Sequence, residues 1–355
     1  MKDNSLIIPR TASRWQTLDW QNSLKAMQLP LTELLNYCGV EPTHFNLQEA
    51  ACEVFTLKVA PHYLQQIKKG DKNDPLLLQV LPSSLEIEPS QDTQILNFTN
   101  DPLEEASFNP VPGLIHKYHG RVLLIANPSC AIHCRYCFRR HFNYEDNTPN
   151  SRQWLRIADY IASDASIHEV ILSGGDPLSS NDKILSQLIA NIAAISHVST
   201  LRIHSRIPSV MPERITNELL TVFSQTRLKV VMVLHINHAQ EISPEVAEAA
   251  GLLQQHGVRL LNQSVLLANI NDTTQTLQQL FFKLHTLDIQ AYYLHLLDRV
   301  KGAEHFLIDD ATAIGLYKSL QQTMPAYMLP KLAREESQQR HKTLIDLNHH
   351  PIVNL

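Results

Sequence analysis

Three of the five cysteines of this chain fall within eight residues, in the run Cys130-Ala-Ile-His-Cys134-Arg-Tyr-Cys137. Three thiolates with this C-x3-C-x2-C spacing can converge on one metal centre. A structural zinc site, or an iron–sulfur cluster held entirely by protein, has four ligands, so this loop is one ligand short. The pattern therefore predicts a [4Fe–4S] cluster held by Cys130, Cys134 and Cys137, with one iron left open to a small molecule.

Two other interpretations of this loop stay open at the level of sequence. The three thiols could be buried and unliganded, or they could hold zinc with His133 or His141 as the fourth ligand. The remaining two cysteines, Cys38 and Cys52, are predicted to be ordinary buried thiols.

A second motif, Ser173-Gly174-Gly175-Asp176-Pro177, follows an apolar run that is predicted to be a strand. Glycine has no side chain, so the backbone at this turn could approach a ligand closely. Taken alone, a Gly-Gly-Asp-Pro turn is common and carries little information. Its place directly after a strand is what makes it a candidate binding motif.

The elements that must position these motifs begin at Arg121. Six apolar runs rich in β-branched residues predict strands, and amphipathic segments between them predict helices, of which the clearest runs over 243–257 with Ser243 as N-cap and Pro244 in its first turn. The predicted strands are 121–127, 169–173, 200–205, 229–236, 258–267 and 290–297. Repeated strand–helix units predict a parallel sheet, either a doubly wound sheet or a partial barrel of six units. In both folds the chemistry belongs at the carboxyl ends of the strands.

The first 115 residues lack this repeated pattern of strands and helices. Short helices are predicted over 32–39 and 62–70, each ending at a glycine. Repeated Asx-Pro and Pro residues in the runs NDPLLLQVLP and TNDPLEEASFNPVPG predict an extended connector.

Composition narrows the class of protein. With 355 residues, 44% hydrophobic and 18% charged, the chain is a folded protein of about two domains or one barrel with attachments. A net charge of −5 argues against nucleic acid as the main partner. No apolar run is long enough to span a membrane, and residues 1–16 lack the pattern of a signal peptide, so a cytoplasmic location is expected. In that reducing compartment, clustered cysteines indicate a metal site before a disulfide.

The cysteine loop followed by the Gly-Gly-Asp-Pro motif resembles the radical S-adenosylmethionine (SAM) superfamily. The resemblance implies a partial (β/α)6 TIM-like barrel over residues 116–329. The pattern of residues 1–115 itself predicts a mostly helical region before it. The resemblance also implies that the open iron is chelated by the amino and carboxylate groups of SAM, which is then cleaved to a 5′-deoxyadenosyl radical. Ser173, Gly174, Gly175 and Asp176 would correspond to the motif that binds the SAM amino group.

A closer resemblance is to the lysine 2,3-aminomutase family, carried by KYHGRVLLIANPSCAIHCRYCFRRHF, SGGDPL, LRIHSRIP, HINH, LLNQSVLLANIND and GAEHF. The short end of the chain, LPKLARE…KTLIDL, is similar to the bacterial branch that makes (R)-β-lysine for elongation factor P. The resemblance implies an isomerase that converts L-lysine with SAM and pyridoxal 5′-phosphate (PLP). Its implied partners are an external electron donor, and elongation factor P with its lysyl-ligase as a functional link; a homo-oligomer is left open.

The same resemblance assigns cofactor and substrate contacts. Lys342, in a C-terminal segment over 330–355, matches the lysine that forms a Schiff base with PLP, and Arg121 matches a residue that contacts PLP. Arg139 matches the arginine that pairs with the substrate carboxylate, while His235 and Gln263 match positions near SAM or PLP. Without the resemblance, each of these would be interpreted as a solvated charge, an ion pair or a hydrogen-bonded core residue.

One departure concerns the substrate's ε-ammonium group, which authentic lysine aminomutases hold with carboxylates. His295 stands where an aspartate is expected after Tyr292-Tyr293, and Asp298 and Glu335 are candidates to replace it. Two rival functions therefore remain: an aminomutase for another amino acid such as glutamate, and a non-catalytic iron–sulfur or zinc protein.

Overall fold

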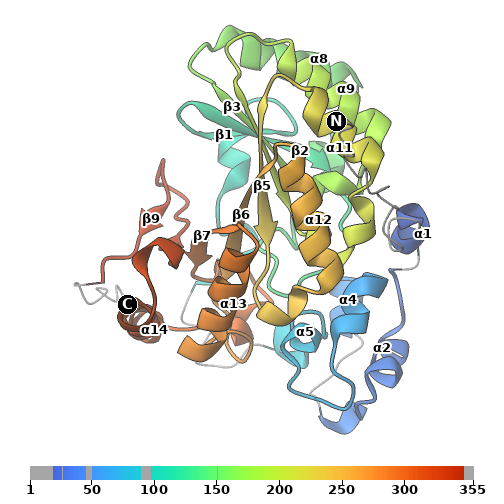
Figure 1. The fold of residues 1–355 in the computed structure, drawn as a ribbon, viewed down its shortest axis with the longest axis vertical. Helices are drawn as coiled ribbons and strands as arrows, with labels where there is room; N and C mark the ends of the chain where they lie inside the picture. Colours follow the sequence, from blue (N-terminus) through green and yellow to red (C-terminus); the bar gives the residue numbers. More distant parts are fainter. Residues whose placement is uncertain (1–18, 26, 45–49, 89–96, 150, 348–355) are drawn as a thin grey trace, which may run out of the picture.

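The fold is described from a computed structural model, which describes residues 19–25, 27–44, 50–88, 97–149 and 151–347 (Figure 1). Its strands are β1 Leu114–Tyr118, β2 Arg121–Asn127, β3 Glu169–Gly174, β4 Thr200–Ser205, β5 Lys229–His235, β6 Arg259–Val265, β7 Gln290–His295, β8 Lys331–Arg334 and β9 Thr343–Leu344. Its main helices are α1 Trp20–Lys25, α2 Leu31–Cys38, α3 Ala50–Val54, α4 Pro61–Gln66, α5 Pro75–Leu78, α7 Tyr144–Asn147, α8 Ser151–Ser163, α9 Asp182–Ala193, α10 Ile207–Val210, α11 Asn217–Gln225, α12 Pro244–Gln255, α13 Thr274–Thr286 and α14 Asp310–Thr323.

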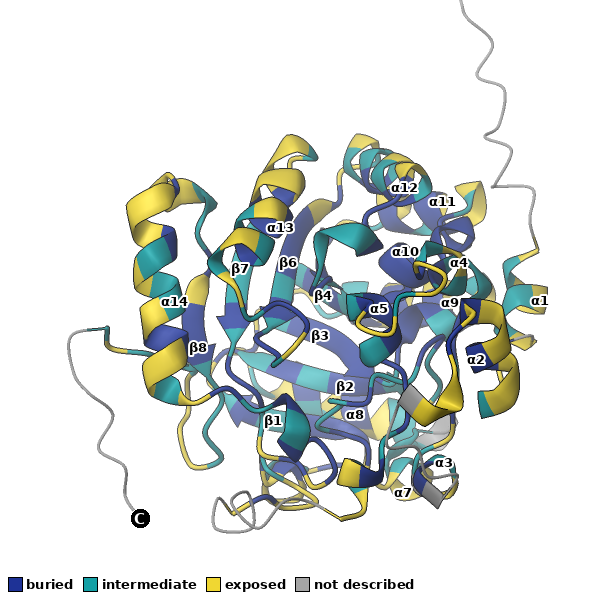
Figure 2. Cartoon of the chain, turned by 90° about the horizontal axis from the view of Figure 1, so that it is seen from below, coloured by how far each residue is buried: buried dark blue, intermediate teal, exposed yellow. Residues whose placement is uncertain are grey.

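The strands are neighbours in the order in which they occur along the chain, from β1 to β9. Strands β2 to β8 pair in parallel, and the β1–β2 and β8–β9 pairs are antiparallel. A doubly wound sheet reverses its strand order at a switch point, which places helices on both faces. Here the order never reverses, so right-handed crossovers put the helices on one face of a curved sheet (Figure 2). The predicted partial barrel is therefore confirmed, and the doubly wound alternative is wrong.

All six strands predicted from the sequence are present as β2 to β7, with ends that differ by two residues or fewer. The structure adds three strands that were not predicted. β8 has four residues and β9 has two, too few for an alternation of apolar and polar residues to be recognised. β1 is a hairpin partner of β2 and carries polar side chains between its apolar ones.

The N-terminal helices correct two predictions. α4 ends at Gln66 rather than reaching Gly70, because Ile67 already has extended backbone. The run NDPLLLQVLP is not an extended connector throughout: it contains the helix α5. Asp74 caps this helix by accepting hydrogen bonds from the backbone N–H groups of Leu76 and Leu77, at 2.9 and 3.0 Å, and Pro75 occupies the first turn.

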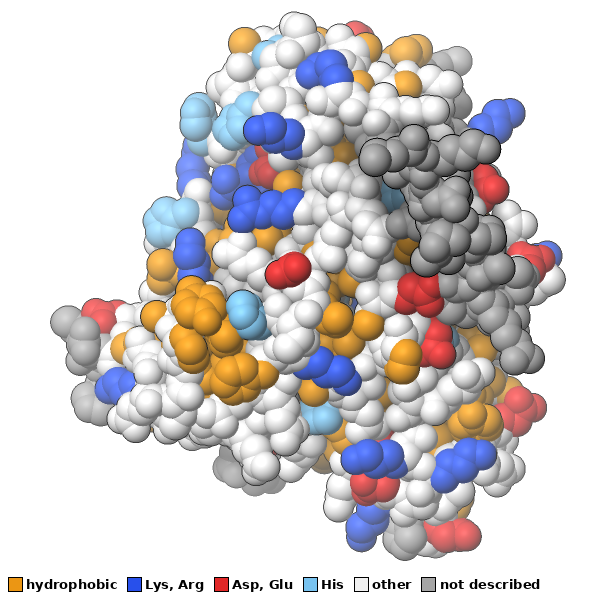
Figure 3. All heavy atoms as spheres, viewed as in Figure 1, with side chains coloured by type: hydrophobic (Ala, Val, Ile, Leu, Met, Phe, Trp, Pro, Cys, Tyr) orange, Lys and Arg blue, Asp and Glu red, His pale blue; other side chains and the backbone are white. Residues whose placement is uncertain are grey.

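The N-terminal region packs on the barrel. Leu34, Tyr63 and Leu77 belong to the same cluster of buried residues as Leu172 of β3 and Leu234 of β5. The proposed divisions at 1–115, 116–329 and 330–355 remain predictions. Within the part of the chain that the structure describes, no helix is long and apolar enough to cross a membrane. On the face shown in Figure 3, Lys and Arg side chains are interspersed with acidic and uncharged ones.

The ends of the strands explain why distant residues meet. The cysteine loop follows β2, the Gly-Gly-Asp-Pro motif begins at the last residue of β3, and Arg206 follows β4. His235 and His295 are the last residues of β5 and β7. Because the carboxyl ends of parallel strands share one rim of the barrel, these side chains gather there, as the sequence predicted.

Candidate active site

One cavity of about 800 Å³ opens within the barrel. All residues assigned to a metal, cofactor or substrate from the sequence line it: Arg121, Cys130, Cys134, Cys137, Arg139, Ser173, Gly174, Gly175, Asp176, His235, Gln263 and Lys342. The cavity also contacts His295, Asp298 and Glu335. Arg121 does not lie at the carboxyl ends of the strands: it is the first residue of β2, at the opposite end of the barrel. It reaches the cavity because the cavity runs through the barrel.

The cysteine loop is anchored to the N-terminal region. His133 donates its backbone N–H to the Lys58 carbonyl at 3.0 Å, and Arg135, fully buried, pairs with Glu86. Burial raises the pKa of the Cys137 thiol to about 11 and that of Cys130 well above its usual value. A bound cation is what would hold such buried sulfurs as thiolates. The three cysteines are half-buried and line the same cavity, so they fit a shared metal centre.

The histidines proposed as zinc ligands have other partners. His133 Nδ1 lies 2.7 Å from the Thr56 carbonyl oxygen, and its ring stacks on Phe55 at 4.6 Å between centroids. His141 Nε2 lies 3.1 Å from the Lys301 carbonyl oxygen. Among the described residues, no three His, Cys, Asp or Glu side chains are arranged to hold a single metal ion. Cys38 is buried as predicted, whereas Cys52 is only half-buried.

The Gly-Gly-Asp-Pro turn packs directly on the start of the cysteine loop. A Cβ added to Gly175 would lie 2.6 Å from the Ser129 carbonyl oxygen and 2.7 Å from the Pro128 carbonyl carbon. The Gly175 N–H donates to the Asn127 carbonyl at 2.7 Å, and Gly174 has a φ of +114°. The close approach that requires glycine here is therefore to the chain's own loop, in addition to any ligand.

Asp176 joins the ends of β3 and β4. Its carboxylate accepts hydrogen bonds from Ser205 Oγ at 2.8 Å and from the backbone N–H groups of Leu178, Arg206 and Ile207, at 3.0, 2.7 and 3.1 Å. Because it already accepts hydrogen bonds from four donors, this side chain holds the loops after β3 and β4 together. A direct contact of Asp176 with SAM stays a prediction.

Gly175→Ala is expected to destabilise the protein by about 1–3 kcal/mol, because the new methyl group overlaps backbone that cannot move freely. It should also lower the iron bound after reconstitution, since the loop that carries the cysteines must shift. Thermal unfolding and iron analysis check both effects. Gly251→Ala is the matched control: no atom lies within 4 Å of its added Cβ, and alanine favours the helix α12. Equal iron content and stability in both variants would contradict the prediction.

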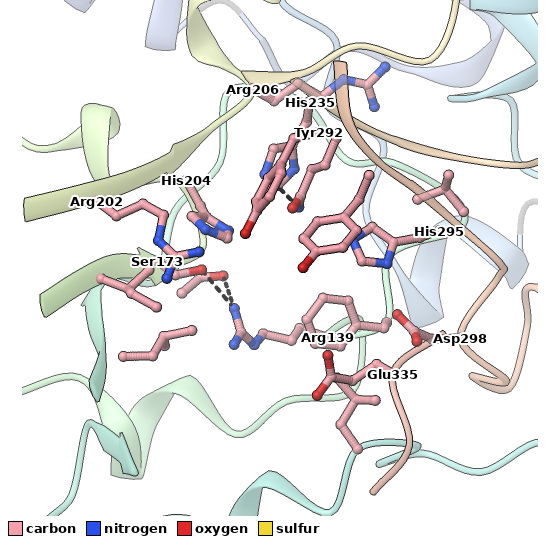
Figure 4. Close-up of a pocket in the computed structure, with 18 of the residues that line it drawn as sticks. Arg139, Ser173, Arg202, His204, Arg206, His235, Tyr292, His295, Asp298 and Glu335 are labelled. Atoms are coloured by element: carbon pink, nitrogen blue, oxygen red, sulfur yellow. Dashed lines mark hydrogen bonds between the residues drawn. The ribbon is translucent and has the colours of Figure 1, made fainter. Parts of the chain in front are cut away.

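Arg139 already has a carboxylate partner that the sequence did not reveal. Its Nε and Nη2 donate to Glu105 at 2.8 and 2.6 Å. Its Nη1 donates to Ser173 Oγ at 3.0 Å (Figure 4). Burial lowers the pKa of Arg139, but Glu105 outweighs burial and leaves it above its usual value. Glu105 occupies one edge of the guanidinium, so an incoming carboxylate would meet the edge that faces Ser173.

Three neutral histidines line the middle of the cavity. Burial is the largest cause that lowers their pKa values: that of His235 falls to about 3, and those of His204 and His295 fall well below the usual value. His235 Nε2 lies 3.1 Å from Gln263 Nε2, which places these two predicted contacts side by side. His204 Nε2 and Arg202 Nε are buried without a hydrogen-bond partner on the same wall. Unpartnered polar atoms in a cavity wall fit a ligand with polar groups of its own.

Lys342 lies just before β9 and also lines the cavity. Its Nζ pairs with Glu335 at 2.7 Å, and Glu335 also contacts Tyr118 and pairs with Lys117 at 3.0 Å. Burial raises the pKa of Glu335, but these partners outweigh burial and lower it. Arg121 lies over the Tyr118 ring at 4.5 Å. An amine, guanidinium groups and unpartnered polar atoms in one cavity would fit PLP. The attachment of PLP to Lys342 and the contact of Arg121 with its phosphate stay predictions.

Comparison with known proteins supports the cluster and identifies the family. Residues 119–205 match a family described as a 4Fe-4S single cluster domain. The chain is 45% identical to L-lysine 2,3-aminomutase of Haemophilus influenzae, over 95% of this chain and 98% of that protein, and 42% identical to that of Escherichia coli, over 93% and 95%. The protein of the same name from Clostridium subterminale is 34% identical, over 88% of this chain and 74% of its own length.

Solved structures are more distant. Coproporphyrinogen III oxidase from Escherichia coli, described as a radical SAM enzyme, aligns with a TM-score of 0.38 and 12% identity, over 65% of this chain and 57% of that chain. The fold is therefore assigned from the order of the strands in the sheet and not from this similarity.

The curved parallel sheet, the three-cysteine loop on its rim and the matched cluster domain define a radical SAM enzyme with a [4Fe–4S] cluster and SAM as cofactors. More narrowly, the chain belongs to the lysine 2,3-aminomutase family, and it is an enzyme of the isomerase class.

Proposed function

We propose that this protein converts L-lysine to (R)-β-lysine, with PLP bound at Lys342 in addition to the cluster and SAM. The observation that carries the proposal is the charge pattern of the cavity. Arg139 faces it from the loop after β2, and two carboxylates, Asp298 and Glu335, contact it from the loops after β7 and β8. Figure 4 shows Asp298 and Glu335 on one side of the cavity and Ser173 and His204 on the other.

This pattern suits a substrate with a carboxylate at one end and a second cation at the other. The carboxylate would bind at the edge of Arg139 that faces Ser173, and the ε-ammonium group would bind between Asp298 and Glu335. Glutamate would place a negative charge against these carboxylates, so the charges favour lysine over the rival substrate.

When bound, the cluster and SAM supply a radical, and PLP supplies an imine π-system that can carry the migrating nitrogen. The protein's own residues position and enclose the substrate. Neutral His204, His235 and His295 line the cavity without adding charge near the reacting carbon.

Anaerobic reconstitution with iron, sulfide, SAM, PLP and reductant tests the proposal. Lysine is expected to yield β-lysine of the R configuration by chiral chromatography, and glutamate is expected to yield no β-amino acid. Turnover of glutamate in place of lysine would transfer the assignment to another aminomutase. A colourless protein that binds zinc and has no turnover would support the non-catalytic alternative.

Asp298→Asn is expected to raise the KM for lysine by about 10–100-fold, the usual cost of a lost charged hydrogen bond. Burial raises the pKa of Asp298 to about 7, although Lys342 opposes the shift. The carboxylate is neutral below this value and charged above it, so kcat/KM for lysine should rise as the pH increases through about 7. The variant should lose that rise. Asp310→Asn, which removes a partner of Arg334 outside the cavity, serves as the control.

We further propose that the product supplies the modification of elongation factor P. The chain is 45% and 42% identical to the Haemophilus influenzae and Escherichia coli proteins but 34% identical to the Clostridium subterminale protein, and its segment LPKLARE…KTLIDL is similar to the branch that serves elongation factor P. Adding the reaction product to elongation factor P and its lysyl-ligase should give a mass shift on the factor. No mass shift, with β-lysine present, would contradict this link while leaving the isomerase assignment intact.

A further inference from the structure

Arg206 is a buried arginine directly after β4, outside the set of residues matched to the cofactors or the substrate. Its backbone N–H donates to Asp176 Oδ2 at 2.7 Å, so the Gly-Gly-Asp-Pro turn holds its main chain. The side chain is 6% exposed and lines the cavity beside the cysteine loop. Its position is therefore set by the two motifs that define the site.

The guanidinium of Arg206 reaches one cysteine. Nη1 donates to Cys134 Sγ at 2.6 Å and to Tyr136 Oη at 2.6 Å. Nη2 donates to Gln79 Oε1 at 2.7 Å and pairs with Glu241 Oε2 at 3.0 Å. Three residues from separate segments therefore orient this guanidinium towards the Cys134 sulfur: Gln79 after α5, Tyr136 in the cysteine loop and Glu241 after β5.

The network around this arginine is itself fixed. Glu241 Oε1 accepts the backbone N–H groups of Asn237 and His238 at 2.9 and 3.0 Å, and Asn237 Nδ2 donates to Tyr136 Oη at 2.7 Å. An arginine side chain stays protonated in proteins, so the guanidinium that contacts Cys134 carries a positive charge. A pre-organised, charged N–H donor therefore faces Cys134 with little freedom to turn away.

The chemistry of the cluster gives this contact a consequence. A [4Fe–4S] cluster with three thiolates carries net negative charge, and one electron from an external low-potential donor makes it more negative. Hydrogen bonds to cluster sulfurs and nearby cations stabilise the reduced form more than the oxidised form, and so raise the reduction potential. In a buried site such a charge is weakly screened.

We propose that Arg206 is a positioning residue of the iron–sulfur centre: it holds the Cys134 thiolate through a hydrogen bond, and its buried charge makes the cluster easier to reduce. Glu241 moderates this effect, because its carboxylate partly neutralises the guanidinium. The proposal rests on the cluster and not on lysine as substrate.

Redox titration of the reconstituted full-length protein, without SAM and followed by electron paramagnetic resonance, tests the proposal. Arg206→Gln should shift the midpoint potential of the cluster to a more negative value, and Arg206→Lys should shift it less. Glu241→Gln should shift it to a more positive value, because the guanidinium loses its counter-charge. A general loss of structure would not move the two variants in opposite directions.

Arg214→Gln is the matched control. Arg214 is fully buried and bonds to Leu178, Ser180 and Asp182, but contacts no cysteine. It should lower the melting temperature and leave the midpoint potential unchanged. The proposal is overturned by an unchanged potential in Arg206→Gln at full iron content, or by shifts of the same sign in the Arg206 and Glu241 variants. If Arg206→Gln assembles no cluster, the midpoint potentials of Arg206→Lys and Glu241→Gln are compared instead. Shifts of opposite sign support the proposal, and shifts of the same sign overturn it.

Discussion

Replacing Lys342 with alanine is expected to abolish the borohydride-stable attachment of PLP and to lower lysine turnover on the order of 10³-fold or more. The amine of Lys342 lies in the cavity beside Glu335 and over the Tyr293 ring at 5.5 Å, and alanine leaves no nucleophilic nitrogen at that place. Mass analysis after borohydride reduction measures the attachment, and chromatography of the product measures turnover.

The control for this variant is Lys331→Ala. Lys331 also contacts the cavity, but it is exposed at the first residue of β8. It should keep both the PLP adduct and turnover near the native level. The Lys342 side chain is 26% exposed, so loss of its ion pair should cost less than about 1 kcal/mol of stability. A reducible adduct that persists in Lys342→Ala would move the attachment to another lysine.

Cys137→Ala should remove the cluster and with it all turnover above the background without enzyme. Cys130 and Cys134 alone cannot hold the centre, because the loop already lacks a fourth protein ligand. Iron and sulfide analysis after anaerobic reconstitution, together with the loss of the brown colour, measures the effect. Turnover should fall in parallel, since cleavage of SAM needs an electron from the cluster.

Cys38→Ala provides the comparison for this loss. Cys38 is buried in α2, outside the cavity, and burial raises the pKa of its thiol to about 11, as for Cys137. Its replacement should cost roughly 1–2 kcal/mol of stability and leave the iron content unchanged. A native iron content in Cys137→Ala would mean that this cysteine is not a ligand of the cluster.

Much of the fold could be predicted because its signals are local. Strands β2 and β5 contain unbroken apolar runs, and β4 alternates buried apolar residues with polar ones, so both kinds of pattern can be recognised in isolation. Ser243 and Pro244 mark the start of α12 in the same way. Helix α5 escaped prediction because two signals conflict: Pro75 breaks extended structure and also begins a helix when an Asp precedes it.

The partners of the site residues could not be predicted, because they are distant in sequence. Glu105 lies 34 residues before Arg139, and its alignment with the guanidinium depends on the hairpin of β1 and β2. Gln79 and Glu241 meet at Arg206 across 127 and 35 residues. A charged residue in a loop has the same local sequence whether it faces solvent or a buried cation.

The amino-acid sequence by itself therefore determined the chemical groups of this protein: the three-cysteine loop, the order of the strands along the chain, and the motifs shared with its family. Tertiary structure decided how those groups are paired. The order of the strands in the sheet distinguishes the curved barrel from the doubly wound sheet. The hydrogen bonds of Asp176 link the loops after β3 and β4. The physical reason is that buried charges can pair only where the ends of different strands lie close together. Which strand ends lie together is determined only when the sheet has curved into the barrel.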